Sequence, residues 1–209
     1  MARTWNFRYF AQKIELGLRE ALEHKSPATT LSDCMRVFYG VFNKPLTSEI
    51  YMGGRAMLPT LGQPAEGGEA TSAKMEKLLV RHIRDPSPHS IFIGDVIAFS
   101  NPMQAASKAS FLVRRVAALE GDEMVSSDPD DEPFAIRAGD CWVLADNASL
   151  EPAEAQDSRT FGPVALSSVL GRVVYYKRSA AEHGVVENSE AARWMDEPVL
   201  ECEVDLEQV

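Results

Sequence analysis

Residues whose side chains could do chemistry are few and widely spaced in this chain of 209 residues. The odd number of cysteines and the lack of a Cys-x-x-Cys pair exclude a complete disulfide framework among Cys34, Cys141 and Cys202. No metal-ligand spacing relates the histidines, which are His24, His82, His89 and His183. The chain also lacks a P-loop and a dinucleotide-binding fingerprint. We therefore expect neither a metal nor a cofactor.

More informative are four short strings that follow one another along the chain. They are Gly54–Thr60 (GRAMLPT), Gly94–Phe99 (GDVIAF), Val113–Asp122 (VRRVAALEGD), and Ala145–Asn147 (ADN) followed by Asp157–Pro163 (DSRTFGP). Each string is weak evidence alone. Together, in this order and spacing, they resemble the type I signal peptidases, most closely their mitochondrial inner membrane protease branch, over about residues 35–178.

This resemblance implies a Ser/Lys hydrolase in which a serine of a Gly-x-Ser-Met-x-Pro-Thr string attacks the peptide bond. A lysine of a Lys-Arg-Val string is the general base, because a serine hydroxyl is a poor nucleophile until a base takes its proton. Here Ala56 stands at the serine position and Arg114 at the lysine position. A methyl group has no oxygen for attack, and a guanidinium stays protonated at physiological pH. We therefore expect no catalytic residue in this chain.

Other residues do not replace the lost pair. Ser158 matches a family serine whose hydroxyl supports the lysine rather than attacking substrate. Thr60 and Ser100 have no visible base partner, and Lys108 would lie about 20 Å from Arg114 along a strand. Structural roles are expected for the remaining motif residues, which are Gly54, Met57, Pro59, Gly94, Asp95, Arg115, Gly121, Asp122, Asp146, Asn147, Asp157 and Arg159.

Two of these expectations leave alternatives open. Arg114 could form a structural ion pair, cap a segment of partner peptide in the old groove, or point to solvent. Asp157 and Arg159 could bridge a loop to a strand, or they could be a solvated pair of little energetic value. Gly94-Asp95 and Gly121-Asp122 are typical of turns between strands.

The elements that must position these residues are mostly short strands. Apolar runs at Ile91–Phe99, Ala109–Leu119, Cys141–Leu144 and Val169–Tyr176 are bounded by Gly, Asp, Asn or Pro. Residues 73–84 suit a helix or a strand, and polar loops are expected at 62–71 and 126–133. The predicted fold class is mainly β: a coiled antiparallel sheet of the signal-peptidase (Ser/Lys protease) type with N-terminal helices.

The N-terminal region is expected to be helical. Apolar residues recur at three- and four-residue steps over 5–23, which predicts an amphipathic helix. That helix could pack on the body or a partner, lie on a membrane surface, or belong to a targeting segment, although its three glutamates argue against the last. Residues 31–42 form a second helix or strand that ends before Pro45. At the place of the family's apolar anchor, residues 34–50 include charged side chains and Pro45, and no apolar run reaches the roughly 18 residues of a membrane span.

Charge is concentrated at the C-terminus. The net charge is -10, and residues 182–209 contain nine acidic residues and one arginine, so residues 1–181 are close to neutral. This balance argues against binding of nucleic acid. Apolar and acidic residues alternate over 200–207, which predicts either a strand that adds to a sheet edge or a disordered acidic tail. We expect three parts: an N-terminal helical extension (1–34), a signal-peptidase-like β domain (35–178) and an acidic tail (179–209).

The expected function is that of a non-catalytic, signal-peptidase-like subunit of a mitochondrial multiprotein assembly at the inner membrane. Its partners would be protein subunits, among them an active protease subunit or a peptide, and peripheral membrane contact would be compatible with this role. One alternative is an inner-membrane-type serine endopeptidase that processes signal sequences or presequences, alone or completed by an active partner. A further alternative is a regulator that presents substrate to such a partner.

Overall fold

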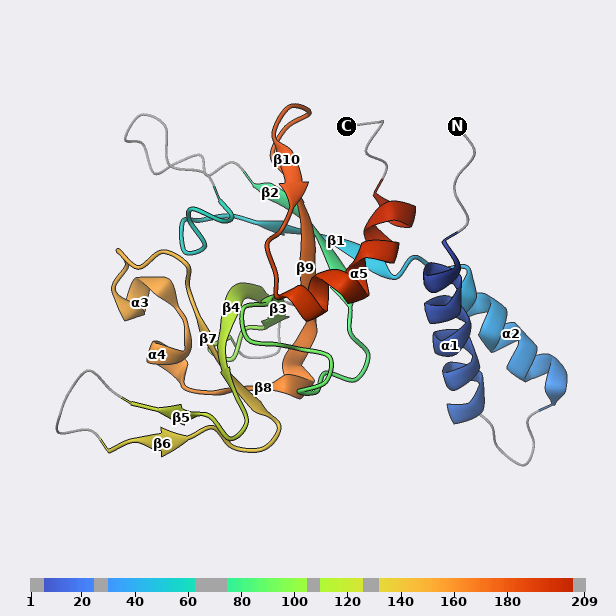
Figure 1. The fold of residues 1–209 in the computed structure, drawn as a ribbon, viewed down its shortest axis with the longest axis horizontal. Coiled ribbons are helices and arrows are strands. Elements are labelled where there is room, and N and C mark those ends of the chain that lie inside the picture. Colours follow the sequence, from blue (N-terminus) through green and yellow to red (C-terminus); the bar gives the residue numbers. More distant parts are fainter. Residues whose placement is uncertain (1–5, 25–29, 63–74, 105–109, 126–131, 205–209) are drawn as a thin grey trace.

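The architecture is a curled antiparallel sheet with a pair of N-terminal helices on one side of it (Figure 1). The computed structural model describes residues 6–24, 30–62, 75–104, 110–125 and 132–204. Within these ranges the mainly β fold class and the N-terminal helices are confirmed. The predicted loops at 62–71 and 126–133 lie largely outside the described residues.

Both N-terminal helices have side-chain caps. Helix α1 (Phe7–Glu23) begins after Asn6, whose side chain accepts hydrogen bonds from two backbone N–H groups of the first turn. Helix α2 (Leu31–Phe42) begins after Thr30, which forms a capping box with Asp33. The amphipathic helix predicted for 5–23 is thus confirmed, and residues 31–42 are helical rather than extended.

The two helices form an antiparallel hairpin. The ring of Phe10 stacks on that of Phe42, with centroids 6.4 Å apart. Further along α1, Gly17 lies so close to Phe38 that a Cβ there would meet its ring. The pairing runs in opposite directions along the two helices, and the small Gly17 permits their close approach.

Within the described residues, eight strands form the main sheet, in the order β1-β2-β9-β3-β4-β7-β8 with β10 paired to β9, and every pairing is antiparallel. Two further strands, β5 and β6, form a separate ribbon. The bounds are β1 (Thr47–Met52), β2 (Glu76–His82), β3 (Val96–Ser100), β4 (Phe111–Leu119), β5 (Glu123–Met124), β6 (Phe134–Ala135), β7 (Asp140–Leu144), β8 (Val164–Ala165), β9 (Val169–Lys177) and β10 (His183–Val185). The ambiguous stretch 73–84 therefore contains a strand over 76–82.

The central strand β3 is covered on both faces. Val96 and Ala98 belong to one buried cluster, together with Met57 from the segment that follows β1. Ile97 and Phe99 point to the other face and belong to a second cluster. Because side chains alternate along a strand, a strand buried on both faces appears in the sequence as a continuous apolar run.

That apolar run, predicted as a strand from Ile91, becomes a strand only at Val96. A turn precedes it, in which Gly94 has a φ of +94° and the carboxylate of Asp95 accepts a hydrogen bond from the backbone N of Phe92 at 3.0 Å. The second predicted turn is also present. There Gly121 has a φ of +87°, and Asp122 accepts from the backbone N of Leu119 at 2.8 Å.

The C-terminal segment differs from the prediction. Residues 190–203 form helix α5 (Glu190–Glu203), capped by the side chain of Ser189, so the predicted edge strand is wrong over 200–203. The buried residues Ala192, Asp196 and Val199 recur at helical spacing. The helix buries this row of residues. The alternation of apolar and acidic residues over 200–207 did not indicate the helix, because that alternation begins eight residues after Ala192. Residues 205–209 lie outside the described residues.

A buried ion network joins α5 to the sheet. Arg172 on β9 donates to Asp95 at 2.7 Å and to Asp196 of α5 at 2.6 Å, and all three side chains are almost fully buried. Arg81 on β2 approaches the second oxygen of Asp196 at 3.2 Å. Asp95 thus does more than make the predicted turn: its carboxylate also accepts hydrogen bonds from Ser189, the residue that caps α5.

Candidate functional site

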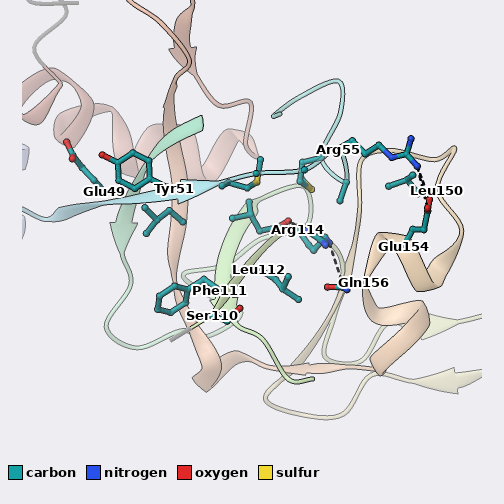
Figure 2. Close-up of a pocket in the computed structure, with 17 residues that line it drawn as sticks. Glu49, Tyr51, Arg55, Ser110, Phe111, Leu112, Arg114, Leu150, Glu154 and Gln156 are labelled. Atoms are coloured by element: carbon teal, nitrogen blue, oxygen red, sulfur yellow. Dashed lines mark hydrogen bonds and ion pairs between the residues drawn. The ribbon is translucent and has the colours of Figure 1, made fainter. Parts of the chain in front are cut away.

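The two positions that correspond to the Ser/Lys dyad of the family pattern lie in one cleft. The cleft has a volume of about 830 Å³ and lies between β1, the segment that follows it, the start of β4 and the short helix α3 (Pro152–Ala155) (Figure 2). Ala56 and Arg114 both line it, although 58 residues separate them in the sequence. The lining also includes Glu49, Tyr51, Arg55, Ser110, Phe111, Leu150, Glu154 and Gln156.

Ala56 is held in place through its backbone. Its carbonyl oxygen accepts a hydrogen bond from the backbone N of Asn147 at 3.0 Å, and the side-chain amide of Asn147 donates to the carbonyl of Arg55 at 2.9 Å. The next residue, Met57, is buried in the core. The segment also contains Gly54, with a φ of +96°, and Pro59, which follows a cis peptide bond. Position 56 is therefore fixed at the wall of the cleft by a residue whose side chain has no oxygen atom.

Arg114 is a buried side chain with carbonyl partners. Its exposed fraction is 6%. Nε donates to the carbonyl oxygens of Ala155 (3.0 Å) and Gln156 (3.2 Å), Nη2 donates to that of Ala155 (2.6 Å), and Nη1 donates to that of Val113 (2.5 Å). These contacts exclude the solvent-directed alternative. Burial lowers the pKa of the Arg114 guanidinium, and the nearby carboxylate of Asp157 opposes this effect.

The Asp157-Ser158-Arg159 string packs against β7 and the residue that follows it. Asp157 accepts from the backbone N of Ala145 at 3.0 Å and from the guanidinium of Arg159, so it bridges the loop to the sheet. Burial raises the pKa of the Asp157 carboxyl, but the hydrogen bonds from Arg159 and Ala145 outweigh it, and the pKa lies below its usual value. The hydroxyl oxygen of buried Ser158 accepts from the backbone N of Val143 at 2.9 Å.

A second arginine, Arg115, links β4 to the loops around Ala56. It donates to both oxygens of Asp146, at 2.8 and 2.7 Å, and to the carbonyl of Gly94 at 2.6 Å. Asp146 also accepts from the hydroxyl of Thr60 at 2.5 Å. Such a two-point pairing of guanidinium and carboxylate fixes orientation as well as distance. The sequence placed Arg115, Asp146 and Thr60 in separate strings and did not predict that they meet.

The rim of the cleft has two carboxylates that sequence reasoning missed. Glu49 pairs with Lys77 at 2.6 Å, and Glu154 pairs with Arg55 at 3.1 Å. Both are exposed. The sequence contains no motif at either position, and only the pairing of β1 with β2 and the placement of α3 bring them to the cleft.

The described lining of the cleft contains hydroxyl groups and two carboxylates that are each paired with a cation. Tyr51 and Ser110 have hydroxyl groups, but the described lining contains neither a lysine nor a histidine. Lys108, weighed above as a substitute base, lies outside the described residues. The first four residues of β4 pair with β3 on one side only, and β1 pairs with β2 alone. The cleft therefore has strand edges on two sides whose backbone groups could bind an extended peptide.

Metal centres and membrane-spanning helices are two other kinds of site that the described ranges could contain. In those ranges, no group of three or more His, Cys, Asp or Glu side chains is arranged to hold a metal ion. No described helix combines the length and apolarity required to cross a membrane.

Comparison with known proteins identifies the family. No protein-family profile matches the sequence. The chain is 38% identical over 214 residues to the mitochondrial ATP-independent inner membrane protease subunit 2 of Arabidopsis thaliana, covering 99% of this chain and 95% of that protein. It is 25% identical over 144 residues to the mitochondrial inner membrane protease subunit 1 of Mus musculus, covering 66% of this chain and 78% of that protein. For subunit 1 of Schizosaccharomyces pombe, the identity is 28% over 122 residues, covering 58% and 67% respectively.

The first of these relatives matches nearly from end to end, and the four strings lie within the matched length. The signal-peptidase-type fold expected from those strings is the one observed. The chain therefore belongs to the mitochondrial inner membrane protease branch of the type I signal peptidase family, and it is a mitochondrial protein associated with the inner membrane.

Proposed function

We propose that this protein is a non-catalytic member of its family and acts as a subunit of a mitochondrial multiprotein assembly. The observation behind this proposal is the chemistry of the cleft: Ala56 and Arg114 line it at the two positions where the family mechanism needs a nucleophile and a base. Each replacement removes one of these groups, and either alone is sufficient to stop a Ser/Lys mechanism.

The surroundings of Arg114 support this reading. A general base must release its proton near neutral pH, and a guanidinium does not do so even when burial lowers its pKa. All four hydrogen bonds of Arg114 go to carbonyl oxygens, and these acceptors favour the protonated form. The side chain thus acts as a fixed cation that joins β4 to the residues at the end of α3.

Binding of partners would use the inherited fold and the parts added at its ends. The relatives are named as protease subunits, which supports a role within a protein complex. The cleft retains two strand edges for an extended peptide, and the N-terminal helices and α5 add surface outside the sheet. Buried or half-buried ion pairs of Asp157, Arg115 and Asp146 hold the loops around the cleft against the sheet and so stabilise this fold.

Purification of the native complex from mitochondria, followed by mass spectrometry and a presequence-cleavage assay, tests this proposal. We expect stable protein partners, and we expect the isolated chain to cleave no presequence peptide. Cleavage by the isolated wild-type chain that is abolished by a cleft substitution would contradict it. A chain that is recovered alone and intact under gentle extraction would also contradict it.

A second candidate is a serine endopeptidase completed by an active partner subunit, in which this chain positions the substrate. The specific observation in its favour is the open cleft, since a scaffold without any peptide role has no need to preserve it. The native complex separates the two candidates. If an active family member co-purifies and Arg55→Glu at the cleft rim lowers cleavage by the complex, this chain presents substrate to that partner. If Arg55→Glu leaves cleavage by the complex unchanged, the non-catalytic scaffold role is supported.

A further inference from the structure

The N-terminal hairpin exposes a row of large apolar side chains. On α1 these are Phe7, Ile14, Leu18 and Leu22, and on α2 they are Leu31, Met35 and Tyr39. Their spacing of four or seven residues puts the members of each helix on one face. Apolar residues scattered singly over a surface are ordinary, but a contiguous row of this size on adjacent helices marks an interaction site.

The other faces of α1 are already occupied. One faces the body: Arg8 pairs with Glu197 of α5, and Glu20 pairs with Arg84. A second faces α2, where Phe10 and Gly17 contact its aromatic rings. The exposed row occupies the face of α1 that remains.

The exposed rows of the two helices lie on the same side of the hairpin. Leu18 immediately follows Gly17, which contacts α2, and Tyr39 immediately follows Phe38, which contacts α1. Because the helices are right-handed and antiparallel, the residue that follows a contact position is turned toward the same side of the pair in both. The hairpin therefore has one continuous apolar face, and Val41 and Leu16 on the opposite side line a pocket against the body.

Charge is divided between the hairpin and the rest of the chain. Residues 1–44 contain seven basic and four acidic residues, a net charge of +3. The remaining 165 residues contain 14 basic and 27 acidic residues, a net charge of -13. On the hairpin, Arg36 and Lys44 are exposed. An anionic surface would attract the helices and repel the body, and would thus orient the molecule with the hairpin toward it.

We propose that the α1–α2 hairpin is a membrane-surface anchor that inserts its apolar face into an anionic lipid bilayer. The row of Phe, Leu, Ile, Met and Tyr side chains suits the boundary between headgroups and acyl chains, and the net positive charge of residues 1–44 suits the headgroups. A bilayer is favoured over a protein partner because the charge division orients the whole molecule and because this protein is located at the inner membrane. The proposal does not depend on what the cleft does.

Flotation of the purified full chain with lipid vesicles tests this anchor. We expect it to bind vesicles of phosphatidylcholine mixed with cardiolipin at least tenfold more tightly than vesicles of phosphatidylcholine alone, and to bind less as salt is raised. Leu18→Glu should lower binding at least tenfold. Ile93→Glu, at a loop position of the body, is the matched control and should bind like the wild type, since the two side chains are 52% and 53% exposed.

Several outcomes would overturn the proposal. One is failure of the wild type to bind either vesicle, and another is equal binding to both vesicle types. A third is unchanged vesicle binding by Leu18→Glu in a protein whose melting temperature matches that of the wild type. If Leu18→Glu instead dissociates a dimer in light scattering, or releases a co-purifying protein while vesicle binding is kept, the face belongs to a second copy or to a protein partner.

Discussion

The guanidinium of Arg114 donates twice to one acceptor, the carbonyl oxygen of Ala155, at 3.0 Å from Nε and 2.6 Å from Nη2. Ala155 is the last residue of α3, and Gln156 after it has a left-handed φ of +48°. The position that holds a base in the family's mechanism thus holds a structural link between β4 and this turn. A lysine has a single terminal nitrogen and could not reproduce this two-point contact.

Replacement of this link should destabilise the protein. We expect Arg114→Leu to lower the free energy of unfolding by about 2–4 kcal/mol, because it leaves the buried carbonyl group of Ala155 and the partly buried one of Gln156 without these donors. Urea denaturation measures the change. Arg137→Ala, which removes an exposed arginine, should shift stability by less than about 0.5 kcal/mol. Equal effects of the two substitutions would show that Arg114 is not a link.

Restoration of both family residues should create activity. We expect Ala56→Ser with Arg114→Lys to cleave a presequence peptide about 100-fold faster than the uncatalysed background, the level at which the wild type stays, since a nucleophile and a buried base then line the same cleft. Each single variant should stay inactive because it lacks one of the two groups. Mass spectrometry of the peptide products measures cleavage. Activity in Ala56→Ser alone would contradict this and reveal a different base, and an inactive but folded double variant would show a remodelled cleft.

Asp157 should make the stability of the protein depend on acidic pH. The pKa of its carboxyl in the folded protein lies below the usual value, so its stabilisation is fully present above about pH 4 and is lost as pH falls through the folded-state pKa. We expect Asp157→Asn to cost about 1–3 kcal/mol at neutral pH and progressively less below pH 4. Melting temperatures from neutral to strongly acid pH measure this difference.

The control for Asp157 is Glu187→Gln, which removes one exposed carboxylate. Its melting curve should follow that of the wild type at every pH. A gap between Asp157→Asn and the wild type that stays constant down to the lowest pH would show that the charge of Asp157 does not contribute.

The attachment of α5 should depend on Asp196. We expect Asp196→Ala to destabilise the protein by about 3–5 kcal/mol, because it leaves Arg172 and Arg81 buried with too little negative charge nearby. Its neighbour Glu197 pairs with Arg8 at an exposed site, and Glu197→Ala should cost less than about 1 kcal/mol. Chemical denaturation of both variants checks the contrast, and similar costs would contradict the assigned role of the network.

Elements with a strong local pattern could be predicted from the sequence. The helix at 7–23 has a regular apolar repeat, and the strands at 111–119 and 169–177 are β-rich runs between turn residues, so each was recognised close to its observed bounds. The C-terminal helix α5 was not predicted from the sequence. Its alternation over 200–207 suggested a strand, while the contact that holds it in place, Asp196 with Arg172, joins residues 24 positions apart.

The candidate site divides in the same way. The sequence by itself determined the family strings and the residue types at positions 56 and 114, and with them the loss of a nucleophile and a base, because those are properties of single side chains. Only the tertiary structure decided that Ala56 and Arg114 line the same cleft and that the guanidinium of Arg114 donates to the carbonyl oxygen of Ala155. It also decided that one apolar face of the N-terminal helices stays exposed. Hydrogen bonds and burial depend on which distant segments the fold brings within a few ångströms, and no local pattern records that.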